Sequence, residues 1–248
     1  MNGPIIAIIQ RNIRVYFPLI VILSSIISFP SLVLILTLLG VDKLIKLNLG
    51  TTYSLFLIPG LICLTILNHS SLVGIGLIND KKRSYQLLKV LPISRLSIIL
   101  GTFLGVIIME IIGVIPLIIL ISVLSGKLAL INYLLVLFYI VLLSIGFFGF
   151  FFSLSIFLKR GIIFSRISST IILLFTFVSG VFYSISKLPP LLKFIALLNP
   201  ITYGADAIRY SLLGVHEINL VFSLIVLVLF SAITLLITLY LFNSKWAR

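Results

Sequence analysis

"LLNPITYGADAIRYSLLG", residues 197–214, places an aspartate and an arginine in a chain that otherwise consists largely of Ile, Leu, Val and Phe. Asn199 followed by Pro200 has the form of a helix N-cap with a proline in the first helical turn. Asp206 and Arg209 are three residues apart, which brings them close enough to pair on one face of a helix. The stretch therefore predicts a short helix that carries an ion pair.

A second short helix is predicted immediately before it. "LLKFIALL", residues 191–198, follows Pro190 and is too short to cross a bilayer, while Gly214 is placed to end the later helix in a left-handed turn. The two pieces predict a re-entrant hairpin over 187–214 that dips into the outer leaflet, where other protein or a water-filled cavity must cover its backbone. The charged pair either holds the hairpin in shape or contacts a substrate directly.

The composition indicates an integral membrane protein. Of 248 residues, 61% are hydrophobic and 9% are charged, and the mean hydropathy is +1.38, far above that of a water-soluble domain. The net charge of +13 comes from 18 basic and 5 acidic residues. Because the basic residues fall between long apolar runs, the charge indicates membrane topology and not nucleic-acid binding.

Six stretches meet the requirement of about 20 mostly apolar residues for a membrane-spanning helix. These predicted spans cover approximately residues 17–39, 53–78, 96–124, 128–158, 162–185 and 218–242. An even number of spans puts both termini on one side, and a cytoplasmic N-terminus places most basic residues in inner loops. We expect one all-α membrane domain over 1–248, multi-pass in the plasma membrane, with both termini cytoplasmic.

The N-terminal segment 4–16 has the pattern of an amphipathic helix. Its apolar positions are Ile5, Ile9, Ile13 and Tyr16, and its polar side carries Arg11 and Arg14. Such a helix lies along the inner leaflet before the first span. The alternative is a first span that begins early, with both arginines extending toward the membrane surface.

The inner loop after the second span predicts a short helix over 81–91, which stops before Pro92. Its basic beginning includes Lys82 and Arg83, and its apolar face is formed by Leu87, Leu88 and Leu91. An apolar face of this kind fits a groove on another protein. The alternative is an ordinary basic inner loop.

Glu110 stands near the middle of the third predicted span among apolar neighbours. An ionisable residue at this depth is costly and is a candidate for function. Glu110 either contacts a substrate or stays protonated and forms a hydrogen bond with a neighbouring helix.

The sequence has no G-x-x-x-x-G-K-[ST] phosphate loop, no H-E-x-x-H motif and no carboxylates spaced for Mg²⁺ or acid/base chemistry. We therefore expect no catalytic site and no metal site on this chain. A membrane prenyltransferase would need paired aspartates, and the acidic residues here are widely separated. A secondary transporter that uses Glu110 for ion coupling remains the alternative function.

Two segments carry a family pattern: "KKRSYQLLKVLPISRLSIILGTFLG" (81–105) and "VSGVFYSISKLPPLLKFIALLNPITYGADAIRYSLLG" (178–214). Both resemble the ABC-2 type permeases, the membrane subunits of ABC exporters. The inner segment of that family ends in a proline, a small hydroxyl residue and a basic residue, as Pro92, Ser94 and Arg95 do here. The outer pattern is matched by Ser179, Gly180, Pro189, Asn199, Pro200, Tyr203, Asp206 and Arg209.

The resemblance implies a half-sized permease that forms the pathway as a dimer and binds a separate cytosolic ATPase. That ATPase would bind ATP and Mg²⁺, so no cofactor is expected on this chain. The N-terminal interface helix and the 81–91 coupling helix would transmit the closure of the ATPase to the membrane domain. The implied partners are thus the ATPase, a second permease copy and the lipid bilayer.

Overall fold

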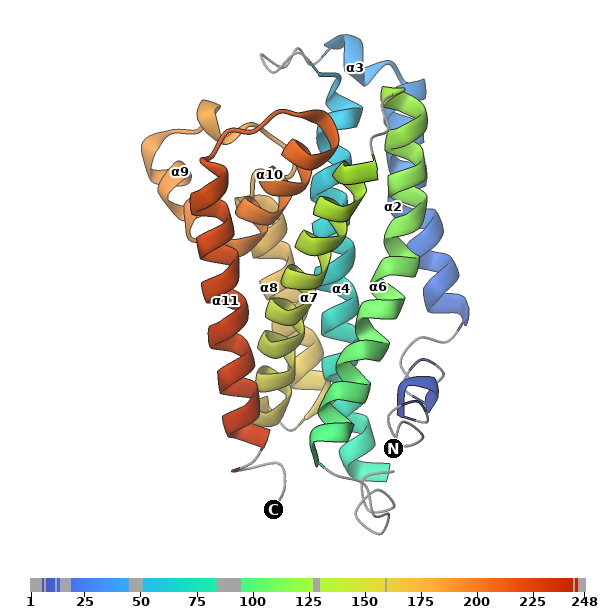
Figure 1. Ribbon diagram of the computed structural model, residues 1–248, viewed down its shortest axis with the longest axis vertical. Helices are drawn as coiled ribbons and strands as arrows, with labels where there is room; N and C mark the ends of the chain where they lie inside the picture. The colour runs from blue at the N-terminus through green and yellow to red at the C-terminus, as the bar shows by residue number, and fades with distance from the viewer. Residues whose placement is uncertain are drawn as a thin grey trace.

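The computed structural model describes residues 6, 8–11, 13, 19–44, 51–83, 95–126, 130–158, 160–242 and 244. Its elements are α2 (Leu19–Leu38), α3 (Val41–Leu44), α4 (Tyr53–Arg83), α6 (Arg95–Ser125), α7 (Leu130–Leu158), α8 (Gly161–Val178), η1 (Ile185–Lys187), α9 (Pro190–Leu197), α10 (Pro200–Leu213) and α11 (Leu220–Leu241). Every regular element of these residues is a helix, and the long helices run side by side as a bundle (Figure 1).

Among the residues that the structure describes, five helices contain segments that are long and apolar enough to cross a membrane: Tyr53–Ile78, Ile99–Ser125, Asn132–Leu158, Gly161–Val178 and Leu220–Leu241. The region of the first predicted span contains α2, whose segment Ile27–Leu38 is apolar but shorter. The bent pair α9 and α10 brings the possible number of spans to six. The prediction of an all-α membrane protein is confirmed.

α4 is the central helix of the bundle. It packs against α2, α6, α7, α8 and α10, and its apolar segment is the most buried of the five. α8 and α11 have mostly exposed side chains and lie at the periphery. The core is therefore built around α4, and α8 and α11 present long faces to their surroundings.

α7 and α11 pack closely against each other. A Cβ atom placed on Gly149 would lie 2.9 Å from the backbone carbon of Thr234, so the two backbones meet at this glycine. The Thr238 hydroxyl donates to the carbonyl of Gly149 at 2.9 Å, and the Ser231 hydroxyl donates to the carbonyl of Leu142 at 2.7 Å. Small residues and hydroxyl groups thus hold this pair, as is typical of helices in a membrane.

α9 and α10 meet at an angle of 85°. α8 ends and α11 begins at the same end of the bundle, where these two short helices lie, so the chain enters and leaves the pair on one side (Figure 1). α10 is buried along nearly its whole length and packs against α4, α7 and α11. α9 exposes the apolar residues Leu191, Leu192 and Phe194. This is the arrangement of a re-entrant hairpin.

The structure differs from the sequence prediction at the end of α8. The fifth predicted span reached residue 185, whereas α8 ends at Val178 because Ser179 has an extended backbone conformation. The apolar residues 181–185 then form the turn that leads into the hairpin, and the Tyr53 hydroxyl of α4 donates to the carbonyl of Phe182 at 3.1 Å.

Candidate functional site

Asn199 stands at the bend of the hairpin and caps α10. Its side-chain oxygen accepts a hydrogen bond from the backbone N–H of Ile201 at 3.0 Å, and Pro200 occupies the first helical turn. Its side-chain amide donates to the carbonyl of Phe175 in α8 at 2.7 Å. The residue therefore satisfies an orphan N–H group of α10 and also ties the hairpin to α8.

The first turn of α10 also holds the end of α9. The Thr202 hydroxyl donates to the carbonyl of Ala196, and the Tyr203 hydroxyl donates to the carbonyl of Leu197, both at 2.6 Å. Carbonyl groups at a helix C-terminus have no partner inside their own helix. The two hydroxyls supply these partners and fix the angle between α9 and α10.

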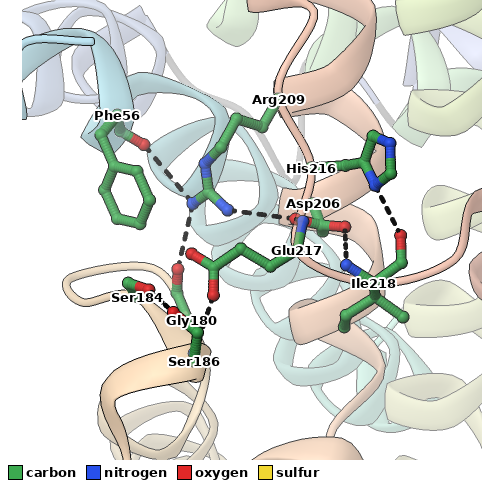
Figure 2. Close-up of polar contacts among 9 residues, drawn as sticks. All are labelled: Phe56, Gly180, Ser184, Ser186, Asp206, Arg209, His216, Glu217 and Ile218. Carbon is green, nitrogen blue, oxygen red and sulfur yellow. Dashed lines mark hydrogen bonds and ion pairs between the residues drawn. The ribbon is translucent and has the colours of Figure 1, made fainter. Parts of the chain in front are cut away.

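Asp206 is fully buried, with 0% of its surface exposed. One carboxylate oxygen accepts a hydrogen bond from the backbone N–H of Glu217 at 2.9 Å, and the other accepts from the N–H of Ile218 at 3.0 Å. Both N–H groups belong to the connection between α10 and α11 (Figure 2). Asp206 therefore fastens the start of the last helix to the hairpin.

Arg209 is 1% exposed and joins α10 to two other segments. Its guanidinium donates to the carbonyl of Gly180 at 3.0 Å and to the carbonyl of Phe56 at 3.5 Å (Figure 2). The guanidinium carbon also lies 3.8 Å from the centre of the Phe56 ring, a favourable cation–π contact. Arg209 thus links the hairpin to the start of α4 and to the turn after α8.

Asp206 and Arg209 also pair with each other, at 3.5 Å. We call Phe56, Gly180, Asp206 and Arg209 the hairpin clamp. Most of its hydrogen bonds join a side chain to a backbone group of another segment. The clamp therefore holds these segments of the chain together. Within the ranges that the structure describes, no group of three or more His, Cys, Asp or Glu residues is placed to hold a metal ion.

Glu217 supports the clamp from the other side of the connection. Its carboxylate accepts a hydrogen bond from the backbone N–H of Ser186 at 2.9 Å (Figure 2). Sequence reasoning did not identify Phe56, Gly180 or Ser186 as partners, because each contributes a backbone group, which every residue has. Glu217 alone gave a signal, as an acidic residue directly after the hairpin.

Glu110 lies in the centre of the bundle and is 0% exposed. Its carboxylate accepts a hydrogen bond from the Ser70 hydroxyl of α4 at 2.9 Å and another from the Ser144 hydroxyl of α7. A Cβ atom on Gly113, one turn further along α6, would lie 2.6 Å from the His69 ring. Glu110 therefore links α6 to α4 and α7. These contacts fit the predicted alternative in which the side chain forms hydrogen bonds with neighbouring helices.

The residues predicted to couple the chain to an ATPase are described only in part. Residues 8–11 are helical, with Ile8 buried and Arg11 partly exposed. α4 continues to Arg83, so Lys82 and Arg83 belong to the last turn of α4 and not to the start of a separate helix. No proline or glycine interrupts residues 79–83, so the helix extends beyond its apolar part. Outside the described residues lie Arg14, Leu87, Leu88 and Leu91.

Comparison with known proteins gives one family. The ABC-2 type transporter family matches residues 5–213. The inner membrane transport permease YadH of Escherichia coli strain K12 is 44% identical over 55 residues, which cover 22% of this chain and 22% of that protein. YadH of Shigella flexneri aligns with the same identity and coverage. The match to both curated relatives thus spans less than a quarter of their length. On the match over residues 5–213, the chain belongs to the ABC-2 type transporter family.

Proposed function

We propose that the chain is the permease subunit of an ATP-driven exporter, in which two copies form the translocation pathway and a separate cytosolic ATPase supplies the energy. The family match over residues 5–213 carries the proposal. The sequence contains no phosphate-binding loop, so ATP and Mg²⁺ are assigned to the partner ATPase. The basic and apolar residues at 81–91 are the proposed docking surface for that partner.

The exposed face of α8 supports a second copy and a pathway beside it. Arg166, Ser169 and Thr170 lie on this face and are exposed, although α8 is long and apolar enough to cross a membrane. Charged and polar side chains in a spanning helix face a protein partner or water in preference to lipid. We therefore assign this face of α8 to the pathway between two copies.

The orientation is proposed from charge and topology. The helical residues 8–11 and the end of α11 lie at the end of the bundle opposite to the hairpin (Figure 1). Basic loops prefer the cytoplasmic side of the membrane. The proposal places both termini in the cytoplasm and the hairpin clamp at the outer surface.

Docking of the ATPase is tested with the tagged full-length chain in its own cells. Affinity purification in mild detergent, followed by mass spectrometry, should recover a protein that contains a phosphate-binding loop. The double variant Arg83→Glu/Leu87→Ser should insert normally but recover much less of that ATPase, because it reverses one charge and removes one apolar contact of the proposed surface. The control Lys187→Glu/Leu191→Ser makes the same chemical changes at two exposed positions near the hairpin.

Equal recovery of the ATPase by both double variants would rule out the 81–91 surface. The energy source has its own test: the purified chain is expected to hydrolyse no ATP, and hydrolysis should appear only with the ATPase present. ATP hydrolysis by the chain alone, after contaminants are excluded, would contradict the proposed division of labour.

A further inference from the structure

A cavity of about 810 Å³ opens at the start of α8, at the end of the bundle opposite to the hairpin. Its lining residues are Ile75, Arg160, Gly161, Ile162, Ile163, Ser165 and Arg166. Ile75 comes from α4, and the others come from α8 and the residue that precedes it. The cavity therefore combines two guanidinium groups with an apolar wall.

Arg160 and Arg166 are both exposed. Arginine keeps its charge at every physiological pH and its planar donors match the oxygens of phosphate and carboxylate groups. Within the part of the chain that the structure describes, no carboxylate forms an ion pair with either residue; the ion pair seen there is Asp206–Arg209. Among the described residues, the cavity thus presents two positive charges that are accessible to a ligand.

The two arginines lie at different positions along the cavity wall. Arg160 has an extended backbone and directly precedes α8, whereas Arg166 lies in the second turn of that helix. Arg166 also lies one turn beyond Ile162 and Ile163, on the same side of α8, and Ile162 is 75% exposed. One charge therefore stands at the start of α8 and the other further along it, with the two exposed isoleucines between them in the sequence.

Two other occupants fit this arrangement less well. A second copy related by two-fold symmetry would bring two more arginines into the same interface, because such an interface joins identical patches. A free inorganic anion would pair with the guanidinium groups but would leave the exposed isoleucines without a contact. A molecule with a negative headgroup and a hydrocarbon chain satisfies both parts of the cavity.

We propose that this cavity binds an anionic amphiphile, with Arg160 and Arg166 holding a phosphate or carboxylate headgroup and Ile75, Ile162 and Ile163 contacting its hydrocarbon chain. The assignment deepens the proposed function, on which it rests for the role of the cavity, because the cavity opens on the face of α8 assigned to the pathway. The binding itself requires neither ATP nor the ATPase.

Binding is tested with the full-length chain in phosphatidylcholine vesicles without ATP. The vesicles contain a trace of phosphatidic acid or of phosphatidylcholine, each with the same photoreactive diazirine near the headgroup end of one acyl chain. After illumination, mass spectrometry measures the labelled fraction of the peptide that contains residues 160–166. Phosphatidic acid should label this peptide about tenfold more than phosphatidylcholine, because charge-assisted hydrogen bonds to guanidinium contribute about that factor.

Three variants test the role of the charges. Arg160→Gln/Arg166→Gln should reduce labelling by phosphatidic acid to the level of phosphatidylcholine. The control Lys187→Gln/Lys193→Gln loses the same charge at exposed positions of η1 and α9, at the opposite end of the bundle, and should label like the wild type. If the first variant does not fold, Ser165→Glu, which adds a carboxylate to the cavity wall, should produce the same loss.

Equal labelling by the two lipids, or unchanged labelling in both Arg160→Gln/Arg166→Gln and Ser165→Glu, would overturn the proposal. Competition by inorganic phosphate at the concentration of the lipid would show a free-anion site and overturn it as well. A disulfide between two copies of an Ile162→Cys, Cys63→Ser chain would show that a second copy fills the cavity, with the same consequence.

Addition of the partner ATPase and ATP distinguishes two sources of the ligand. ATP-dependent movement of fluorescent phosphatidic acid between leaflets would identify the bound amphiphile as cargo, and labelling without movement would identify it as a resident lipid. Both results support the site. A chain that binds phosphatidic acid but captures no ATPase would contradict the proposed function and leave the binding site intact, so the two failures are distinguishable.

Discussion

Arg209 and Asp206 are expected to be the most sensitive positions of the hairpin. Each replacement by alanine leaves the other charge and several backbone groups unpaired inside the protein, which costs about 3 to 5 kcal/mol for a buried pair. The double replacement should cost less than the sum of the two single ones, because the stranded charge is then absent. Thermal unfolding of the purified variants measures these differences.

Two further variants sharpen this test. Arg209→Lys keeps the charge but cannot reproduce the planar contact with Phe56 or reach two carbonyls at once, so it should remain strongly destabilised. Lys187→Ala, at an exposed position, should change stability by less than about 0.5 kcal/mol. Single alanine variants of Asp206 and Arg209 that are as stable as Lys187→Ala would show that the clamp does not hold the hairpin.

Glu110 is expected to tolerate glutamine but not alanine. Glutamine can accept a hydrogen bond from one serine hydroxyl and donate to the other, so Glu110→Gln should fold and transport like the wild type. Glu110→Ala removes both bonds and should lose about 1 to 3 kcal/mol of stability. A well-folded Glu110→Gln protein that has lost transport would instead favour ion coupling through this carboxylate.

The sequence was sufficient to identify Asn199, Asp206 and Arg209, because polar and charged residues are rare in such a chain and their spacing fits a capped helix. It was not sufficient to identify the partners of the charges. Every residue has a backbone carbonyl, so the sequence does not show that those of Phe56 and Gly180 accept hydrogen bonds from Arg209. Phe56 also lies more than a hundred positions before Arg209 in the chain. Contacts made by backbone groups appear only once the helices are placed in space.

The burial of α10 predicts a clear pattern of chemical labelling. Ala205 and Ala207 are both fully buried. In a Cys63→Ser background, Ala205→Cys and Ala207→Cys should therefore remain unlabelled by a membrane-impermeant maleimide, while Lys187→Cys, on the exposed turn before α9, should label quickly. Rapid labelling at both alanine positions would show that α10 belongs to a solvated loop and not to a buried hairpin.

The α7–α11 contact predicts a difference between two threonines. Thr238→Val removes a hydroxyl that donates to Gly149 of the facing helix and should cost about 0.6 kcal/mol, up to about 1.7. Thr170→Val is the matched control, since that hydroxyl donates only to Arg166 in its own helix and is exposed. Detergent-dependent unfolding of the two variants gives the comparison, and equal stability would mean that the interhelical bond contributes nothing measurable.

Helix existence was predictable from apolar length, but helix ends were not. Residues 180–185 are mostly apolar and continue the apolar run of α8, yet they form a turn whose backbone is held by Tyr53 and Arg209 from other segments. At the other end of the bundle, α4 runs to Arg83 because nothing in the polar residues after its apolar part breaks a helix. Hydropathy indicates that a segment lies in apolar surroundings, whereas helix termination depends on local backbone chemistry and tertiary contacts.

The proposed orientation of the whole bundle is tested by single cysteines at its two ends. In a Cys63→Ser background, Lys43→Cys and Lys187→Cys should react with an impermeant maleimide in intact cells, because both positions are exposed at the end assigned to the outside. Arg160→Cys lies at the opposite end and should react only after permeabilisation. The reverse pattern would invert the topology and place the termini outside.

The hairpin clamp also has a consequence for biogenesis. Its four connections come from α4, from the turn after α8, from α10 and from the residues just before α11, and they therefore span most of the chain. During synthesis, Asp206 and Arg209 emerge from the ribosome before Glu217 and Ile218, so the aspartate has no amide partners until the last helix begins to form. An insertion intermediate therefore contains the charges of Asp206 and Arg209 without all the hydrogen-bond partners that they have in the folded protein. Chains interrupted before residue 217 should therefore be preferred substrates of membrane proteases, and the clamp serves as a check that synthesis has reached the final helix.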